Sequence, residues 1–143
     1  NNFRGLVDAL IDLKEGFPTF APLQVGFNAT AFQDVTDGDA LFMRTSDGQV
    51  GKASAADGTS EEATVVGFAN ATVSANSTVK VVVVGLKTLS SLNAGDLFFL
   101  SDSTAGGITT TPPSGAGKAV TRVGEASTTT DFAIHIDAPV LLR

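Results

Sequence analysis

The side chains best known for catalysis are scarce in this chain, which has one histidine and no cysteine. Without cysteine it has no thiol nucleophile, disulfide or thiolate metal site. A Ser–His–Asp triad would have to use His135. Apolar Phe132, Ile134 and Ile136 alternate with the residues around it, a pattern typical of a strand with one face in water. We therefore interpret His135 as a surface-facing strand residue.

Two acidic clusters remain as candidates for chemistry. Asp34, Asp37 and Asp39 offer closely spaced oxygen ligands for a calcium ion, but their spacing is not that of an EF-hand, so we favour a role in turns. Glu61 and Glu62 are adjacent, and neighbouring residues of a strand point to opposite faces, where they do not flank one glycosidic bond. We predict that the chain is not an enzyme and has no catalytic, metal-binding or cofactor-binding residues.

Composition narrows the classes of partner. The chain has 143 residues, the size of one domain, with 43% hydrophobic and 17% charged residues, enough apolar material for a core. Its formal net charge is −6, which repels phosphate backbones and anionic lipid, so we expect neither nucleic acid nor membrane as a partner. No apolar stretch approaches the roughly 18 residues that span a bilayer.

The aromatic residues are ten phenylalanines, with no tyrosine and no tryptophan. Phenylalanine brings only apolar area, whereas tyrosine and tryptophan add the polar group that suits wet ligand sites. A carbohydrate-binding module stays open as an alternative, but this composition counts against it.

The first 24 residues differ from the rest. Apolar residues at three- and four-residue spacing predict a short amphipathic helix between Phe3 and Leu13, which Gly16 and Pro18 end. Two prolines among apolar residues predict an extended arm over Phe17–Gln24. A helix of about three turns and such an arm both need a surface to bury against. We therefore predict that residues 1–24 attach the chain to a partner. The predicted contact residues are Phe3, Leu6, Leu10, Leu13, Phe17, Phe20 and Leu23.

From residue 25 to residue 143 the sequence predicts a β domain, in which short strand-like runs alternate with Asp-Gly, Gly-Gly and Pro-Pro turn signals. The fold class we expect is all-β, a small barrel or sandwich of short antiparallel strands. Val81–Val84 is an unbroken β-branched run, which we expect to be buried on both faces. The predicted strands are Ala40–Arg44, Thr64–Ala69, Val79–Val84, Leu97–Leu100, Lys118–Val123 and Phe132–Ile136.

The β domain also carries signs of an internal duplication. Gly38–Met43 resembles Gly95–Leu100 at an offset of 57 residues, and Val66–Ala69 matches Val123–Ala126 at the same offset. The duplication predicts two similar sets of strands. Their expected limits are residues 25–85 and 86–143.

The second of these sets resembles a module of tailed-bacteriophage virion proteins, and Gly38–Gly85 of the first set resembles the strands that usually precede it. The resemblance rests on Leu92–Asp102, the Gly-Gly-Ile-Thr-Thr-Thr-Pro-Pro run of 106–113, Ala119–Gly124 and Phe132–Ala138. It covers about residues 25–142 and leaves out the first 24. Proteins with this module are β-rich, often homotrimeric, and bind other virion proteins or a host surface.

The resemblance implies a virion structural protein. The first hypothesis is a capsid decoration or cement protein that binds the major capsid protein or another virion protein and stabilises the head surface. A second hypothesis is a tail-fibre, head-fibre or spike module for host attachment. The carbohydrate-binding module is the third. The expected location is the virion and the expected assembly a homotrimer.

Overall fold

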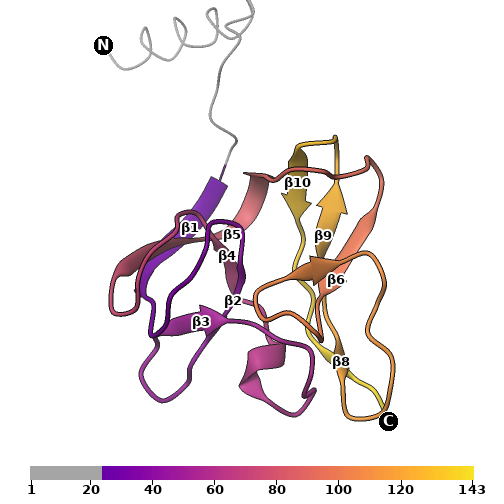
Figure 1. Ribbon diagram of the computed structural model, residues 1–143, viewed down its shortest axis with the longest axis horizontal. Coiled ribbons are helices and arrows are strands. Elements are labelled where there is room, and N and C mark those ends of the chain that lie inside the picture. Colours follow the sequence, from indigo (N-terminus) through magenta and orange to yellow (C-terminus); the bar gives the residue numbers. More distant parts are fainter. Residues whose placement is uncertain (1–23) are drawn as a thin grey trace, which may run out of the picture.

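The computed structural model describes residues 24–143, and the predicted all-β fold is confirmed there (Figure 1). The predicted helix Phe3–Leu13 and the arm up to Leu23 lie outside the described residues. The elements are β1 (Gln24–Thr30), β2 (Ala40–Met43), β3 (Val50–Lys52), the 3-10 helix η1 (Glu61–Ala63), β4 (Gly67–Ala69), β5 (Thr78–Thr88), β6 (Leu97–Leu100), β7 (Ile108–Thr109), β8 (Ala119–Val120), β9 (Arg122–Ala126), β10 (Asp131–Ile134) and β11 (Val140–Leu141).

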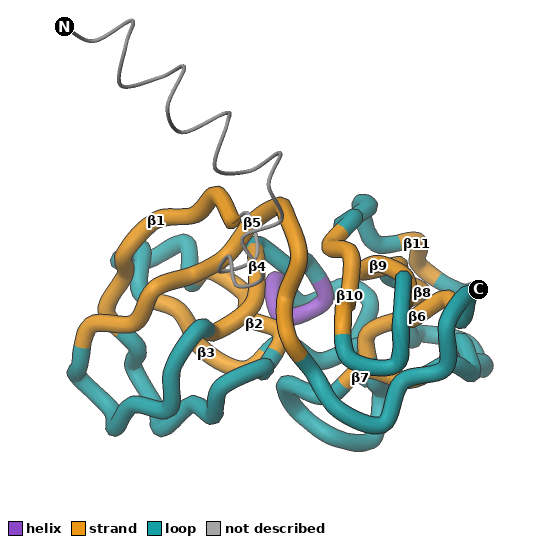
Figure 2. The backbone as a smooth tube through the Cα atoms, turned by 90° about the horizontal axis from the view of Figure 1, so that it is seen from above, coloured by secondary structure: helices purple, strands orange, loops and turns teal. Residues whose placement is uncertain are grey.

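The strand order is nearly symmetric about its centre. The main sheet runs β3-β2-β4-β5-β10-β9-β6-β7, with β1 also paired to β5, while β8 and β11 form a separate pair. On either side of the central β5 and β10 the same arrangement recurs, with β4, β2 and β3 on one side and β9, β6 and β7 on the other. Figure 2 shows the resulting two lobes. We call residues 25–85 the first half and 86–143 the second half.

The register of the strands repeats at the offset seen in the sequence. In the first half Leu41 of β2 pairs with Gly67 of β4. In the second half Phe98 of β6 pairs with Gly124 of β9, and each of these residues lies 57 positions after its counterpart. A Cβ atom on either glycine would overlap the next strand, at the Val82 carbonyl for Gly67 and at the Ala133 carbonyl for Gly124. Both halves therefore need glycine at the same point of the sheet.

The turns that lead into β2 and β6 repeat as well. The Gly38 N–H donates to the Ala69 carbonyl at 2.9 Å, and the Gly95 N–H donates to the Ala126 carbonyl at 2.7 Å. Both glycines have positive φ, +93° and +91°, which glycine adopts without steric cost. The same turn, in the same place, explains why the Gly-Asp pairs recur in the sequence.

The two halves share the long strand β5. Its first part pairs with β1 and β4 and is the last strand of the first half. Its last four residues, Gly85–Thr88, pair with β10 and open the strand set of the second half. No flexible linker separates the halves, because one continuous strand serves both.

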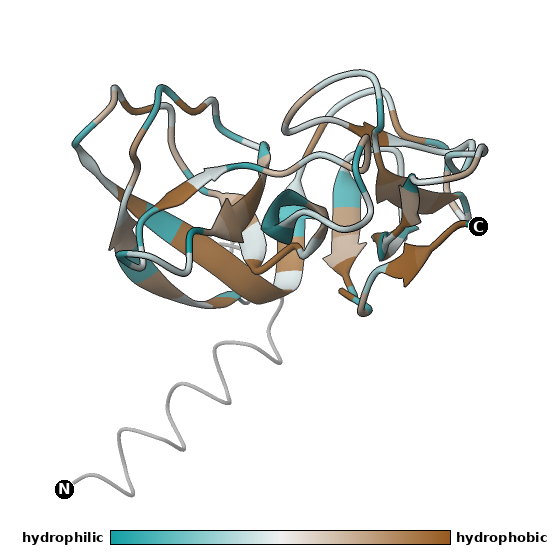
Figure 3. Ribbon diagram, turned by 90° about the horizontal axis from the view of Figure 1, so that it is seen from below, coloured by the Kyte–Doolittle hydropathy of each residue, from teal (hydrophilic) through white to brown (hydrophobic). Residues whose placement is uncertain are grey.

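Two hydrophobic cores follow from this arrangement, and the strands carry most of the hydrophobic residues (Figure 3). The smaller core lies inside the first half. Its buried residues are Ala31, Val35, Leu41, Val50, Ala69, Val79 and Val81. The larger core joins the opposite face of the first-half strands, with Phe42, Phe68 and Val82, to the inside of the second half, with Phe98, Leu100 and Phe132.

The halves differ in how their sheets close. In the first half the strands curl round until Ala31 bridges Val50, and the Phe32 N–H donates to the Val50 carbonyl at 3.0 Å. Leu89 occupies the position 57 residues after Phe32, but its N–H donates to Thr130 instead. The inside of the second half is covered by the first half. The Phe68 ring lies 5.3 Å from the Phe132 ring in an edge-to-face contact.

Several sequence predictions need correction. The run Thr64–Ala69 is a strand only over Gly67–Ala69. Glu61 and Glu62 lie in η1 rather than in a strand, because the Ser60 hydroxyl accepts a hydrogen bond from the Glu62 N–H and begins a helical turn there.

The prediction for Val81–Val84 was wrong at its end. Val81 and Val82 are fully buried, but Val84 is 49% exposed. Val84 pairs with Val25 near the start of β1, at the margin of the sheet, where no further layer covers it.

Candidate functional site

All seven predicted contact residues, from Phe3 to Leu23, precede the described part of the chain, so the structure places only the point where that segment joins the body. There Gln24 is held by hydrogen bonds from its Nε2 to the Leu86 carbonyl, at 3.1 Å, and to the Asn70 side chain, at 3.5 Å. The next residue, Val25, is 58% exposed and pairs with Val84. We call Val25 and Val84 the entry patch. It places an exposed apolar pair directly after the predicted attachment segment.

The sole histidine lies just past the end of β10. The His135 side chain is 67% exposed, and its Nε2 lies 3.3 Å from the Asp137 carboxylate. This agrees with its interpretation as a surface residue, although the strand ends at Ile134, two residues earlier than predicted.

The aspartate cluster is divided among separate structural contacts. Asp34 accepts from the Ala75 N–H at 2.8 Å, and Asp39 accepts from the Thr36 N–H at 2.8 Å. Asp37 forms an ion pair of 2.6 Å with Lys87. Within residues 24–143, no group of three or more His, Cys, Asp or Glu side chains is placed to hold a metal ion.

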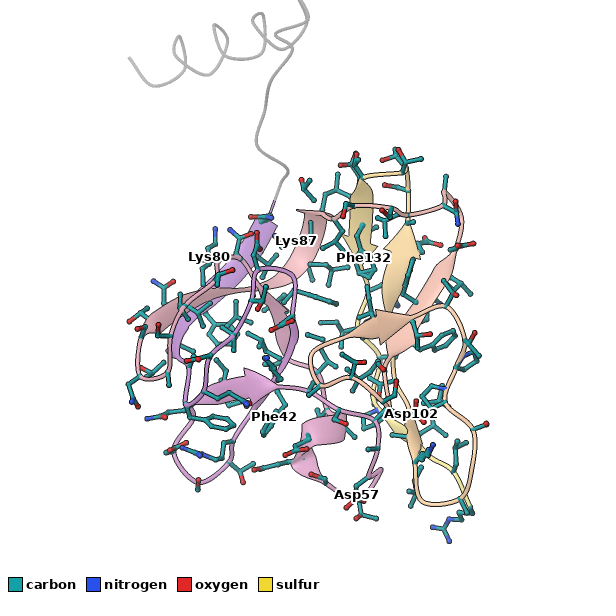
Figure 4. The ribbon with its side chains drawn as sticks, in the orientation of Figure 1. Phe42, Asp57, Lys80, Lys87, Asp102 and Phe132 are labelled. Carbon is teal, nitrogen blue, oxygen red and sulfur yellow. The ribbon has the colours of Figure 1, made fainter. Side chains whose placement is uncertain are left out.

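Lys87 is the one strongly buried cation of the described chain, with a side chain only 6% exposed. It lies near the end of β5, the strand common to both halves (Figure 4). Its partner Asp37 belongs to the turn before β2 in the first half. A buried ammonium needs such a partner, because the charge is costly to remove from water alone. The pair therefore fixes the turn of the first half to the shared strand.

Glu61 acts as an acceptor for a neighbouring turn. Its carboxylate accepts from both the N–H and the hydroxyl of Thr45, at 3.0 and 2.8 Å. These hydrogen bonds lower the pKa of the Glu61 carboxyl. A carboxylate held ionised in this way is poorly suited to act as a general acid.

A polar groove, which sequence reasoning missed as a site, lies beside the hairpin of the second half. It encloses about 480 Å³ and is lined mainly by hydroxyl side chains, two prolines and one ion pair. In that pair the Lys118 ammonium lies 2.5 Å from the Asp102 carboxylate, and its hydrogen bond lowers the pKa of Asp102. Figure 4 labels Asp102 in this hairpin. Much of the groove is lined by the Gly-Gly-Ile-Thr-Thr-Thr-Pro-Pro run of 106–113. This run was the feature of the sequence that could have indicated a site here.

The groove offers hydrogen bonds but no reactive group. The Ser101 hydroxyl is already engaged, since it accepts from the N–H groups of Ser103 and Thr104 at 3.2 and 3.1 Å. Lys118 and Asp102 neutralise each other. The surface is suited to contact with a polar partner rather than to a chemical step.

A second cavity, of about 360 Å³, lies where the second half fails to close. Asp37 and Asp39 of the first half line it on one side, and Leu89, Leu92 and Ile108 of the second half line it on the other. Its position corresponds to the bridge between Ala31 and Val50 that closes the first half.

No protein-family model matches the chain, and no curated protein matches it in sequence. Across residues 24–143, no helix is long and apolar enough to cross a membrane.

Proposed function

We propose that the chain is a non-catalytic structural protein of a tailed-phage virion, which decorates the head and binds the major capsid protein through its N-terminal segment. The observation that carries the proposal is the entry patch. Val25 and Val84 are exposed at the point where the apolar segment containing Phe17, Phe20 and Leu23 meets the body. Most other large apolar side chains of the described chain are buried in one of its two cores.

The form of the body supports the same role. Both cores are built without disulfides, and a single strand joins the two halves. Each aromatic side chain that is well buried contributes roughly 1.5–3 kcal/mol to stability. A compact body of this kind is a durable platform for an attachment segment. The homotrimer that the resemblance implies belongs to the same proposal.

Copy number tests the proposal most simply. Virions whose genome encodes this chain would be purified, and the chain quantified against the major capsid protein by mass spectrometry with calibrated peptides. A decoration protein is expected in hundreds of copies per particle. A few to tens of copies would support the fibre hypothesis instead, and absence from the particle would contradict both.

The role of the attachment segment is tested with the full chain and capsids that lack it. Replacing Phe17 and Phe20 with aspartate removes apolar area and adds charge, so binding to the capsids is expected to be lost. Thr19→Asp combined with Asn2→Asp is the matched control, because it adds the same two negative charges to the segment without removing a phenylalanine. Equal binding by the double variant and the control would contradict the proposed attachment.

A further inference from the structure

We propose that the outer face of the second half is a surface through which copies of this chain associate with one another. The face is centred on a row of paired residues, Leu97 of β6, Glu125 of β9 and Ala133 of β10. Directly paired residues of antiparallel strands present their side chains on the same face. Phe99 and Arg122 form the next pair beside this row. We call these five residues the outer row. The inference deepens the homotrimer that belongs to the proposed function, because it assigns the surface through which copies meet, and its tests involve neither the attachment segment nor the capsid.

In the first half, the face that is equivalent to the outer row is buried. Ala40, Phe68 and Val82 pair in the same succession across β2, β4 and β5, and all three are fully buried. They lie in the larger core, and Phe68 contacts Phe132 of the second half. In the first copy of the unit, the outer face is therefore a protein interface.

In the second half none of the five outer-row residues belongs to a hydrophobic core of the described chain. Leu97 is 42% exposed where its counterpart Ala40 is buried. Glu125 is exposed at the position of Phe68. Arg122 takes the position of the buried Val65 and is half-buried. The face has kept apolar side chains, Leu97 and Phe99, and has gained two opposite charges.

Those charges favour a second copy as the partner. Arg122 and Glu125 carry opposite signs on one small face, so a partner of a single charge sign would meet repulsion from one of them. Another copy, related by a symmetry axis, brings Glu125 to Arg122 and Arg122 to Glu125.

Cysteine crosslinking tests the proposal, because the natural chain has no cysteine. Leu97→Cys in the full chain is expected to give an intermolecular disulfide under mild oxidation. Lys80→Cys is the control, since Lys80 is exposed on the part of β5 that pairs with β1 in the first half, away from the outer row. Crosslinking of Leu97→Cys that greatly exceeds the control supports the interface. Equal or weaker crosslinking overturns it.

Charge exchange provides an independent measurement, by sedimentation equilibrium of the full chain. Glu125→Arg or Arg122→Glu places like charges together between copies and is expected to weaken association by about tenfold or more. The double exchange restores opposite charges and is expected to recover the association. Association that neither single variant weakens, or that the double variant fails to recover, contradicts the proposal. Circular dichroism confirms that each variant is folded.

Discussion

The two halves of this protein are built on one plan and differ in how each completes its core. The first half closes its own sheet through the bridge between Ala31 and Val50 and encloses a core of its own. The second half leaves that position open, and the outer face of the first half packs over its interior. The first half thus completes a core on its own, whereas the second half, with the same strand order, needs the first half to complete its core.

One pair of equivalent positions shows the physical origin of this difference. Phe68 and Glu125 lie 57 residues apart and hold the same place in β4 and β9. Phe68 is fully buried, whereas Glu125 is exposed. Burial suits phenylalanine and is costly for an ionised carboxylate. The identity of this one residue therefore marks which face lies between the halves and which faces outward.

The largest expected loss of stability comes from replacing Phe68 of the first half with glutamate, the residue at the equivalent position of the second half. Phe68→Glu would put an unpaired carboxylate against Phe132 in the larger core and would remove the edge-to-face contact. We expect a loss of stability of about 4 kcal/mol or more, measured by chemical denaturation. Glu125→Gln, measured at a dilution at which the chain is a monomer, is the control and is expected to change stability by less than about 0.5 kcal/mol. A Phe68→Glu variant with near-normal stability would contradict the assigned interface between the halves.

A smaller effect is expected at the matched glycines. Gly67→Ala and Gly124→Ala each push a Cβ atom into the backbone of the next strand, at Val82 and at Ala133. Each is expected to cost roughly 1–3 kcal/mol, because the backbone must shift to admit the methyl group. Similar decreases in melting temperature for the two variants would support the structural equivalence of the halves. A decrease for only one of the two variants would contradict it.

The smallest effect concerns acid pH and the ion pair of each hairpin. The hydrogen bond from Lys118 lowers the pKa of Asp102, and the hydrogen bond from Arg44 lowers the pKa of Asp47 in the first half. A carboxyl whose pKa is lowered by folding stabilises the protein above its unfolded pKa, and this contribution is lost as the pH falls through the folded value.

Asp102→Asn and Asp47→Asn should therefore lower the melting temperature slightly at pH 7. Because both pairs are open to solvent, the difference from the natural chain should shrink toward zero below about pH 3. A difference that persists or grows in acid would contradict the assigned ion pairs.

Periodicity and turn signals were enough to predict the all-β fold. Two short matches at one offset pointed to the strand pairings and turns that recur 57 residues apart. The Gly-Asp turns at Gly38 and Gly95 kept the offset, because a turn with positive φ depends on local chemistry. The short strands β3, β7 and β11 were missed, since two or three residues carry no periodicity. The seven-residue strand β1 was missed as well, because apolar and polar residues do not alternate regularly along Gln24–Thr30.

The different ways in which the two halves complete their cores could not be predicted from the sequence. The closure at Ala31 and Val50 joins residues whose types do not distinguish them from other small or branched residues of the chain. The polar groove beside Asp102 and Lys118 brings together residues 16 positions apart, and nothing in their types marks them as a pair. Both features depend on long-range pairing, which local patterns do not encode.

Native-state hydrogen exchange at rising denaturant concentration tests the dependence of the second half on the first most directly. Opening of the first half removes the lid of the second, whereas the second half can open while the core around Leu41 and Val81 persists. Amides of β9 and β10 are therefore expected to exchange through an opening of lower free energy than those at the centre of β5 and in β2. Higher protection in β9 and β10 than anywhere in the first half would contradict the account.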